Sequence, residues 1–312
     1  MQPAPQVFVV DLTGKPCLPT RPARARILIR NGKAKVIQVV PYTIQLKREV
    51  ENPVGSFEVG IDDGAKFVGV SVVNDQTKEV VFYGEIKLRQ DVSLKMEQRK
   101  TYRRSRRTRN LGYRQPRFSN RISSFLAPSI RCRKDSILRF IKDMMKRINI
   151  TKVTVEEVTF NQNKSLRGKW FSLVETGKIY LREQILKLGL IFKYVHGYMT
   201  KEWRLNLGLS KTHGNDAIAI ACRENKPTIS SLYFTILPRR TKPAHDKTCT
   251  EKNGFRHYDL VKAERAGETV IGSIKALKKG RIVLRTEKDN NYTVQYSKTR
   301  LLQRFEGLAY AY

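Results

Sequence analysis

The chain has 312 residues, of which 61 are Lys or Arg and 28 are Asp or Glu, so its formal net charge is +33. A hydrophobic content of 40% excludes a disordered basic tail, and no apolar run approaches the ~18–20 residues of a membrane span. So large a positive charge repels itself in a compact fold, and we therefore expect a polyanionic partner, of which nucleic acid is the commonest.

Residues 1–52 are rich in short β-prone runs that turn signals separate. The runs lie at 7–10, 26–29, 35–40 and 43–46. Asn31-Gly32 predicts a β-hairpin because both residues tolerate a positive φ. We expect a small strand-rich domain over this range.

Residues 57–86 predict three successive strands. Tight-turn signals, Asp63-Gly64 and Asn74-Asp75, separate runs of β-branched and aromatic residues. Because strands joined by tight turns must run antiparallel, the segment predicts an antiparallel meander.

A strongly basic helix is predicted after the meander. Ten Lys or Arg and no acidic residue lie between positions 99 and 121. No apolar stripe runs through this segment, so it cannot pack on a protein core. Like charges at this density favour a helix that contacts nucleic acid over a flexible basic arm. The candidate binding residues are Arg99, Tyr102, Arg103, Arg104, Arg106, Arg107, Arg109, Arg114, Arg117 and Arg121.

The remaining elements alternate in type and then return to strands. We expect helices at 134–148, at 174–188 and from position 216, strands at 153–156 and 190–195, a loop or linker at 226–253, and strands at 268–274, 281–285 and 292–296. The order of the elements up to position 225 predicts an α/β mixed sheet with helices on its faces, and the last three strands predict a small barrel.

Cysteine and histidine spacing excludes a zinc finger. None of the four cysteines forms a Cys-x-x-Cys pair, and none of the four histidines forms a His-x₃₋₅-His pair. The chain start lacks a charged region followed by an apolar core. We expect free thiols and a cytoplasmic protein.

Three acidic residues stand at the ends of predicted elements. Asp62 ends the first strand, Glu156 ends the fourth, and Asp216 begins a helix. Taken singly, Asp62 is typical of a turn, Asp216 of a helix cap, and His213 of an ordinary polar residue. Glu157 beside Glu156 leaves open which of the two takes part.

Together these residues predict catalysis on a phosphodiester. The first and fourth strands are neighbours in such a sheet, so Asp62 and Glu156 face each other, and close carboxylates demand a cation. Carboxylate oxygens favour Mg²⁺ or Mn²⁺, and two such ions can activate water and stabilise a leaving oxygen. His213, three residues before Asp216, can act as a general base or orient the water.

These motifs resemble those of RuvC nucleases. Val59-Gly60-Ile61-Asp62-Asp63-Gly64, Val153-Thr154-Val155-Glu156 and His213-Gly214-Asn215-Asp216-Ala217 are similar to the first, second and third RuvC motifs. The resemblance implies an RNase H-like fold in which Asp62, Glu156 and Asp216 bind metal.

Other segments resemble transposon-encoded IscB-type proteins. Tyr102-Arg103-Arg104-Ser105-Arg106-Arg107 is similar to their RRxRR bridge helix, which is inserted into the RuvC fold. Pro16-Cys17-Leu18-Pro19 is similar to their N-terminal PLMP domain, although the tetrapeptide differs from the eponymous one. Gly254-Phe255-Arg256 with Asp259-Leu260-Val261 resembles the start of their C-terminal domain.

The spacing of the motifs favours the IsrB subtype. IscB proteins carry an HNH nuclease after the second RuvC motif, but only 57 residues separate Glu156 from His213 here, which leaves no room for one. The resemblance implies a monomeric RNA-guided nickase that uses an omega RNA to open duplex DNA, cuts the non-target strand, and acts on the nucleoid of a prokaryote.

The implied domains follow the chain. They are a PLMP-like domain (1–52), a first RuvC segment (53–90), the bridge helix (91–122), the second and third RuvC segments without an HNH insertion (123–225) and a β-barrel that contacts the DNA motif (226–312). Two alternatives stay open: a guide-free RuvC-type junction resolvase, and a non-catalytic RNA-binding protein with a degenerate fold.

Overall fold

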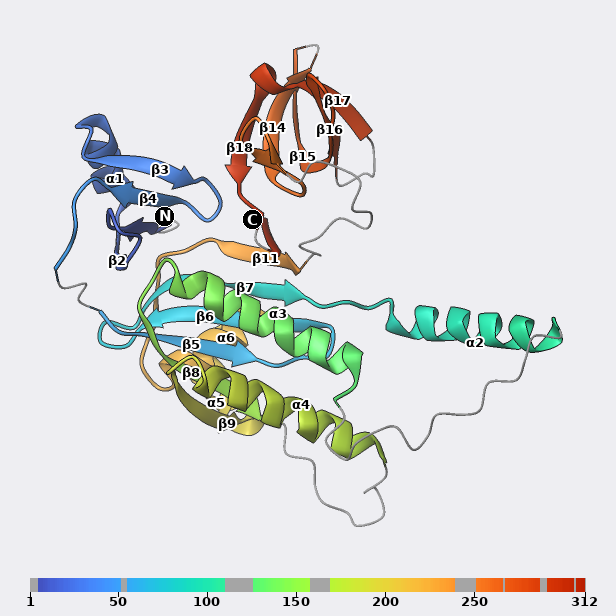
Figure 1. Cartoon of the computed structure of the whole chain (residues 1–312). Helices are drawn as coiled ribbons and strands as arrows, with labels where there is room; N and C mark the ends of the chain where they lie inside the picture. Colours follow the sequence, from blue (N-terminus) through green and yellow to red (C-terminus); the bar gives the residue numbers. More distant parts are fainter. Residues whose placement is uncertain are drawn as a thin grey trace.

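The computed structural model describes residues 5–51, 55–109, 126–157, 169–238, 251–265, 267–286, 291–305 and 307–311. The described chain is a mixed α/β structure with an eight-stranded central sheet, separate four-stranded and five-stranded sheets, and a two-stranded hairpin (Figure 1). Within these ranges no helix is both long enough and apolar enough to span a bilayer. Cys17, Cys132 and Cys222 are free thiols, as expected, and Cys249 lies outside the described residues.

The N-terminal unit is a four-stranded sheet with one helix. Its elements are β1 (Val7–Val10), β2 (Pro16–Thr20), α1 (Pro22–Arg30), β3 (Ala34–Gln38) and β4 (Thr43–Leu46), with the strand order β2-β1-β4-β3. The side chains of Val7, Val9, Ala25 and Ile44 form its small core.

Two expectations for this unit are wrong. The run at 26–29 is part of α1 rather than a strand, because Pro22 occupies the first helical turn and Gly32 follows the helix end with φ +68°. Asn31 is consequently the C-cap of α1, and Asn31-Gly32 joins a helix to β3 instead of closing a hairpin.

The central sheet contains the expected meander at its centre. Its strands are β5 (Phe57–Asp62), β6 (Phe67–Asn74), β7 (Glu79–Lys87), β8 (Ile150–Glu157), β9 (Ile191–His196), β10 (Thr228–Ile229), β11 (Tyr233–Pro238) and β19 (Leu308–Ala311). Strands β5, β6 and β7 pair antiparallel, as predicted, and β8 and β9 add in parallel beside β5. The path is β19-β11-β7-β6-β5-β8-β9, with β10 also paired to β7.

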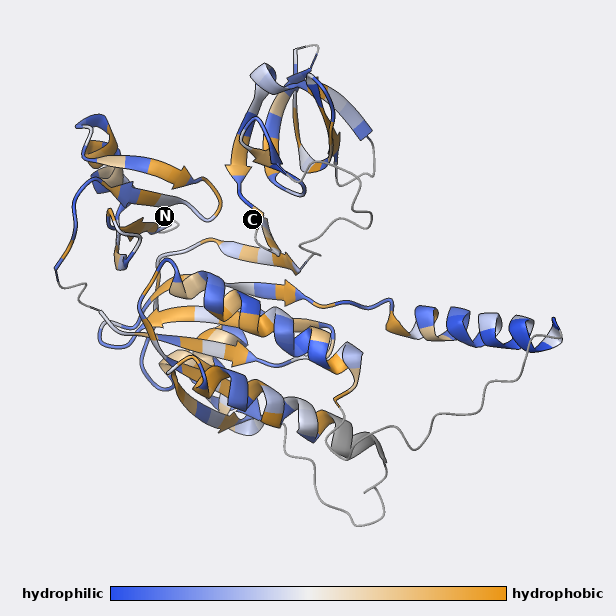
Figure 2. Cartoon of the chain, in the orientation of Figure 1, coloured by the Kyte–Doolittle hydropathy of each residue, from blue (hydrophilic) through white to orange (hydrophobic). Residues whose placement is uncertain are grey.

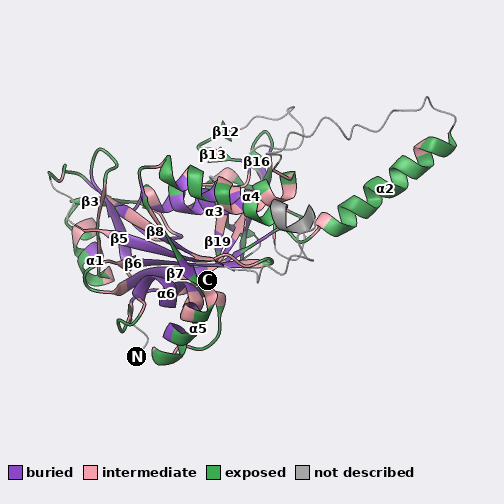
Figure 3. Ribbon diagram, turned by 90° about the horizontal axis from the view of Figure 1, so that it is seen from below, coloured by how far each residue is buried: buried purple, intermediate pink, exposed green. Residues whose placement is uncertain are grey.

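Helices cover both faces of the central sheet (Figure 3). They are α3 (Pro128–Met145) and α4 (Lys169–Leu186) on one face, and α5 (Gly197–Asn206) and α6 (His213–Cys222) on the other. The expected amphipathic helix is confirmed, since Ile137, Phe140, Ile141 and Met144 of α3 are buried against the sheet. Helix α5 was not expected from the sequence.

The expected loop or linker at 226–253 is wrong for much of its described part. Strand β11 extends the central sheet beside β7, and β19, from the chain end, pairs antiparallel with β11. Residues 239–250 of that segment lie outside the described residues. The segment 226–312 therefore contributes β10, β11 and β19 to the central sheet, in addition to the strands of the curled C-terminal sheet.

The C-terminal strands form a curled antiparallel sheet with a core of its own (Figure 1). Its elements are β14 (Leu260–Arg265), β15 (Glu268–Leu277), β16 (Arg281–Arg285), β17 (Asn291–Gln295), the 3₁₀ turn η2 (Tyr296–Lys298) and β18 (Thr299–Gln303), in the order β17-β16-β15-β14-β18. The hairpin β12 (Glu251–Lys252) and β13 (Phe255–Arg256) precedes it. The three strands expected here are confirmed as β15, β16 and β17.

Candidate active site

Two adjacent parallel strands bring Asp62 and Glu156 to the same edge of the central sheet. Strand β5 pairs with β8 in a register that places Ile61 opposite Val155, one residue before each acid. Side chains alternate between the faces of a strand, and Ile61 and Val155 are buried in the core beneath α3 and α4. Asp62 and Glu156 therefore lie on the opposite face, which α5 and α6 cover.

Helix α6 approaches this face unusually closely. A Cβ atom at Gly60 would lie 2.2 Å from the carbonyl oxygen of Ala217, and one at Gly69 would lie 1.8 Å from that of His213. Only glycine permits such contact between a helix backbone and a strand. The Oγ atom of Ser71 donates to the same Ala217 oxygen at 2.8 Å. These contacts fix the first turn of α6 beside the end of β5.

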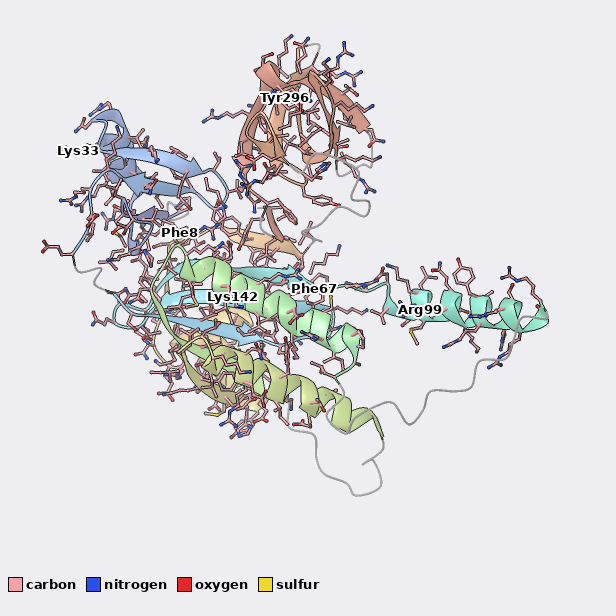
Figure 4. The ribbon with its side chains drawn as sticks, in the orientation of Figure 1. Phe8, Lys33, Phe67, Arg99, Lys142 and Tyr296 are labelled. Carbon is pink, nitrogen blue, oxygen red and sulfur yellow. The ribbon has the colours of Figure 1, made fainter. Side chains whose placement is uncertain are left out.

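This first turn places the His213 side chain within hydrogen-bond distance of Asp62. The Nδ1 atom of His213 lies 2.7 Å from Oδ2 of Asp62, and the imidazole stacks on the ring of Phe67 with 5.7 Å between the centroids. Figure 4 labels Phe67 in the central sheet. Burial raises the pKa of Asp62, and the hydrogen bond and positive charge of His213 partly offset that rise.

Asp216, one turn into α6, forms an ion pair with Arg204 of α5. The Nε atom of Arg204 lies 2.7 Å from Oδ1 of Asp216, and both side chains are largely buried. A second guanidinium nitrogen donates to the carbonyl oxygen of Leu209 at 3.2 Å. Burial nevertheless raises the pKa of Asp216, although Arg204 acts against that rise.

Glu156 has the largest shift of pKa among these acids. Burial, followed by repulsion from Asp62, raises its pKa to about 7, and Asp216 adds to the repulsion. The nearby Thr200 hydroxyl opposes the rise, although it is not aligned for a hydrogen bond. A Cβ atom at Gly197 would lie 2.6 Å from Oε1 of Glu156, so the carboxylate also abuts the start of α5.

The structure separates Glu156 from its neighbour Glu157. Glu157 lies 3.9 Å from Nζ of Lys178, which belongs to α4 on the other face of the sheet. Asp63 is likewise paired with Lys134 of α3. Glu156 is therefore the member of this pair that faces Asp62 and Asp216.

The donor set suits a hard divalent cation. Asp62, Glu156 and Asp216 all have raised pKa values, and each of the first two is raised further by its acidic neighbours, which is the condition that a bound cation relieves. Within the described ranges, however, no three His, Cys, Asp or Glu side chains lie close enough together to hold one ion. Binding of one ion by three of these side chains would therefore need side-chain rotation, and the metal site stays a prediction.

Arg204 is a member of this cluster that the sequence patterns did not predict. Its helix, α5, was not predicted, although buried Trp203 and half-buried Met199 and Leu207 recur every four residues, as on an amphipathic helix. That spacing was the available signal. Contact between Arg204 and Asp216 depends on how α5 packs on α6, which spacing cannot show.

The basic helix projects away from the central sheet (Figure 1). It is α2 (Val92–Thr108), and every one of its residues is exposed or half-exposed. Figure 2 shows that most of its length is hydrophilic. Helix α2 carries Arg99, Tyr102, Arg103, Arg104, Arg106 and Arg107, and Arg109 is its C-cap. The other candidate binding residues, Arg114, Arg117 and Arg121, lie outside the described residues. Nucleic-acid binding by α2 stays a prediction.

Comparison with known families gives a match over more than half of the chain. The family described as "RRXRR protein" matches residues 7–175. The chain belongs to the RRXRR protein family. The matched range of this RRXRR protein contains Asp62, Glu156 and the Arg103-Arg104-Ser105-Arg106-Arg107 motif on α2, whereas His213 and Asp216 lie beyond it.

Other comparisons are weaker. No curated protein matches this RRXRR protein. Among solved structures, Thermus thermophilus RuvC is similar at 16% identity, over 53% of this chain and 90% of that one, with a TM-score of 0.30. A T. thermophilus RuvC complex with a Holliday junction substrate gives the same coverage and TM-score at 15% identity. At this TM-score the similarity does not establish a shared fold.

Proposed function

We propose that this RRXRR protein is a RuvC-type nuclease with an RNase H-like central sheet, which nicks DNA under the direction of a guide RNA. The observation that carries the proposal is the convergence of Asp62, Glu156, His213 and Asp216 on one face of the sheet, at the ends of β5 and β8 and in the first turn of α6. The strand order agrees with the resemblance of the sequence motifs to RuvC.

Asp62, Glu156 and Asp216 would hold two Mg²⁺ or Mn²⁺ ions. When bound, such ions supply an activated water and stabilisation of the leaving oxygen of a phosphodiester. The clustered carboxylates contribute hard oxygen ligands. Their partial burial limits the access of bulk water, which competes with them for the ions.

His213 has the geometry of a proton acceptor. Donation from Nδ1–H to Asp62 fixes the imidazole and leaves Nε2 able to accept a proton from the attacking water. Its side chain is 42% exposed, so water and substrate can reach the ring. Asp62 would thus orient the base as well as contribute a metal ligand.

Helix α2 would bind the phosphates of the guide RNA or the guide–target duplex. Its guanidinium groups can form two-pronged contacts with phosphate oxygens, and no described side chain of α2 is buried. Guide pairing would supply the sequence choice, so the protein would mainly hold backbones.

The remaining assignments follow the IsrB resemblance. The N-terminal unit (1–52) would be PLMP-like, the curled C-terminal sheet would contact the DNA motif, and one protein chain would act with one omega RNA. A single catalytic site would cut one strand per binding event, which makes nicked rather than broken duplex the main product.

The test uses the full chain, purified with its RNA. That RNA is sequenced, and a plasmid that carries the matching target is incubated with the complex and Mg²⁺. We expect nicking of the non-target strand, its loss in Asp62→Asn, and its retention in the control Glu183→Gln, which removes an exposed acid on α4, on the opposite face of the central sheet (Figure 3).

Two results would redirect the proposal. Cleavage of a four-way junction by RNA-free protein, without a discrete co-purified RNA, would indicate a junction resolvase. Tight RNA binding with no Mg²⁺-dependent or Mn²⁺-dependent cleavage of any target would indicate a non-catalytic RNA-binding protein.

A further inference from the structure

A pair of exposed rings lies at the carboxyl end of β9, the strand that pairs with the Glu156 strand β8. His196, the last residue of β9, stacks on Tyr198 in the first turn of α5, with 5.7 Å between centroids and 10° between the ring planes. Tyr198 is 70% exposed, and His196 is also exposed. The pair therefore presents an aromatic surface to solvent instead of filling a core.

The position of this pair ties it to Glu156. Gly197, the residue between the two rings, is the one whose Cβ would lie 2.6 Å from Oε1 of Glu156. Val195, just before His196, is also the register partner of Glu156 across β8 and β9. The two rings thus flank Gly197, against which the Glu156 carboxylate lies, while His196 itself is the register partner of Glu157.

A lysine lies on the same helix as Tyr198. Lys201 is exposed and lies three residues after Tyr198 on α5, so the two side chains are neighbours on the helix surface. An exposed ring next to a lysine is the combination that single-stranded nucleic acid uses, with a base on the ring and a phosphate on the cation. An intact duplex offers no free base face along its length, because its bases are already stacked on one another.

We propose that Tyr198, supported by His196, is a base-stacking platform for the single-stranded DNA that enters the carboxylate site, and that Lys201 contacts an adjacent phosphate. The inference rests on the proposed function, which requires a displaced strand to reach Asp62 and Glu156. The platform would hold that strand by a base next to the bond that is cut, without regard to base identity, since every base has a flat face.

The binding test uses the complex in an Asp62→Asn background, so that no cutting occurs, and a target whose displaced strand carries 2-aminopurine at successive positions. We expect quenching at one position near the nick site, its loss in Tyr198→Leu, and its retention in Tyr198→Phe, which keeps the flat ring. Affinity for a short mixed-sequence single-stranded DNA should fall ~5–150-fold in Tyr198→Leu. Lys201→Gln should weaken binding and reduce its salt dependence while leaving the quenching in place.

Kinetics and stability separate this role from a structural one. In the nicking-competent chain, Tyr198→Leu should raise KM more than it lowers kcat, and its melting temperature should match that of Tyr198→Phe. Unchanged quenching and affinity in Tyr198→Leu would overturn the platform even if Asp62→Asn abolishes nicking.

A fall in the affinity of Tyr198→Leu for an RNA oligonucleotide, but not for DNA of the same sequence, would overturn the choice of ligand. Absence of nicking in the wild type would count against the proposed function, whereas the binding measurements would still report on Tyr198.

Discussion

Arg204 and Asp216 form a largely buried ion pair across the α5–α6 interface, with 2.7 Å between Nε and Oδ1. The guanidinium offsets the negative charge of Asp216, which raises the pKa of both Asp62 and Glu156. A divalent cation bound by Asp216 would therefore share this carboxylate with the positive charge of Arg204, and the two charges would compete for it.

Replacement of Arg204 should make stability depend on metal. Arg204→Ala leaves Asp216 buried without its partner, and loss of one member of such a pair costs about 3–5 kcal/mol. We expect millimolar Mg²⁺ to restore a larger part of the free energy of unfolding in this variant than it adds to the wild type, because the ion replaces the missing charge. Urea unfolding with Mg²⁺ and with EDTA measures the effect of the ion on each protein.

Equal effects of Mg²⁺ on Arg204→Ala and the wild type would contradict a competition between Arg204 and the ion for Asp216. Arg204→Lys keeps a positive charge, so its gain in the free energy of unfolding from Mg²⁺ should lie between those of the other two proteins.

Glu156 should make the metal-free protein less stable as pH rises. Its pKa is raised from 4.5 to about 7, so the folded chain holds this proton more tightly than the unfolded chain between those values. The stabilisation is complete below about pH 4.5 and is lost as the pH rises through 7. Glu156→Gln stays neutral, so relative to the wild type it should gain about 1–2 kcal/mol from pH 5 to pH 8, a value reduced for partial solvent screening.

Unfolding in urea with EDTA, repeated across that pH range, measures this difference. Glu264→Gln, which replaces an exposed glutamate on β14, is the matched control and should track the wild type. Parallel curves for Glu156→Gln and the wild type would show that burial does not hold the Glu156 proton.

Gly69→Ala should reduce nicking by displacing the first turn of α6. The added methyl would meet the His213 carbonyl oxygen at 1.8 Å, so the first turn of α6 must move and carry His213 and Asp216 with it. We expect nicking to fall by at least about 100-fold, as is typical of a misplacement near 1 Å. Val70→Ala, which truncates a buried side chain on the opposite face of β6, should cost about 2–4 kcal/mol but leave nicking of the folded protein nearly unchanged. Similar rates for the two variants would remove the role of the close α6 contact.

The arginines of α2 should govern binding without affecting folding. Replacement of Arg103, Arg104, Arg106 and Arg107 by Gln removes four exposed charges from a helix with no buried residue. The melting temperature should therefore stay within about 1–2 °C of the wild type. The slope of log affinity against log salt should shrink by up to about 3.6, since each of the four phosphate contacts contributes about 0.7–0.9. An unchanged slope would place the nucleic acid elsewhere.

Local signals in the sequence were enough for much of the central sheet. Alternating apolar residues and two tight turns predicted β5 to β7, and an i, i+3, i+4 pattern predicted α3, because each pattern depends only on near neighbours. The same reasoning failed at 26–29, where a short apolar run fits a strand or a helix equally well. Pro22 and Gly32, at the two ends of α1, were the stronger signals there.

The identity of Asp62, Glu156, His213 and Asp216 as a candidate set was determined by the sequence, through residue type and position at element ends. Only the tertiary structure decided that Glu156 rather than Glu157 faces Asp62, that Arg204 holds Asp216, and that β11 and β19 complete the central sheet. Strand pairing and helix packing join residues far apart in the chain, and their partners are chosen by burial and register over the whole fold, which a local pattern does not contain.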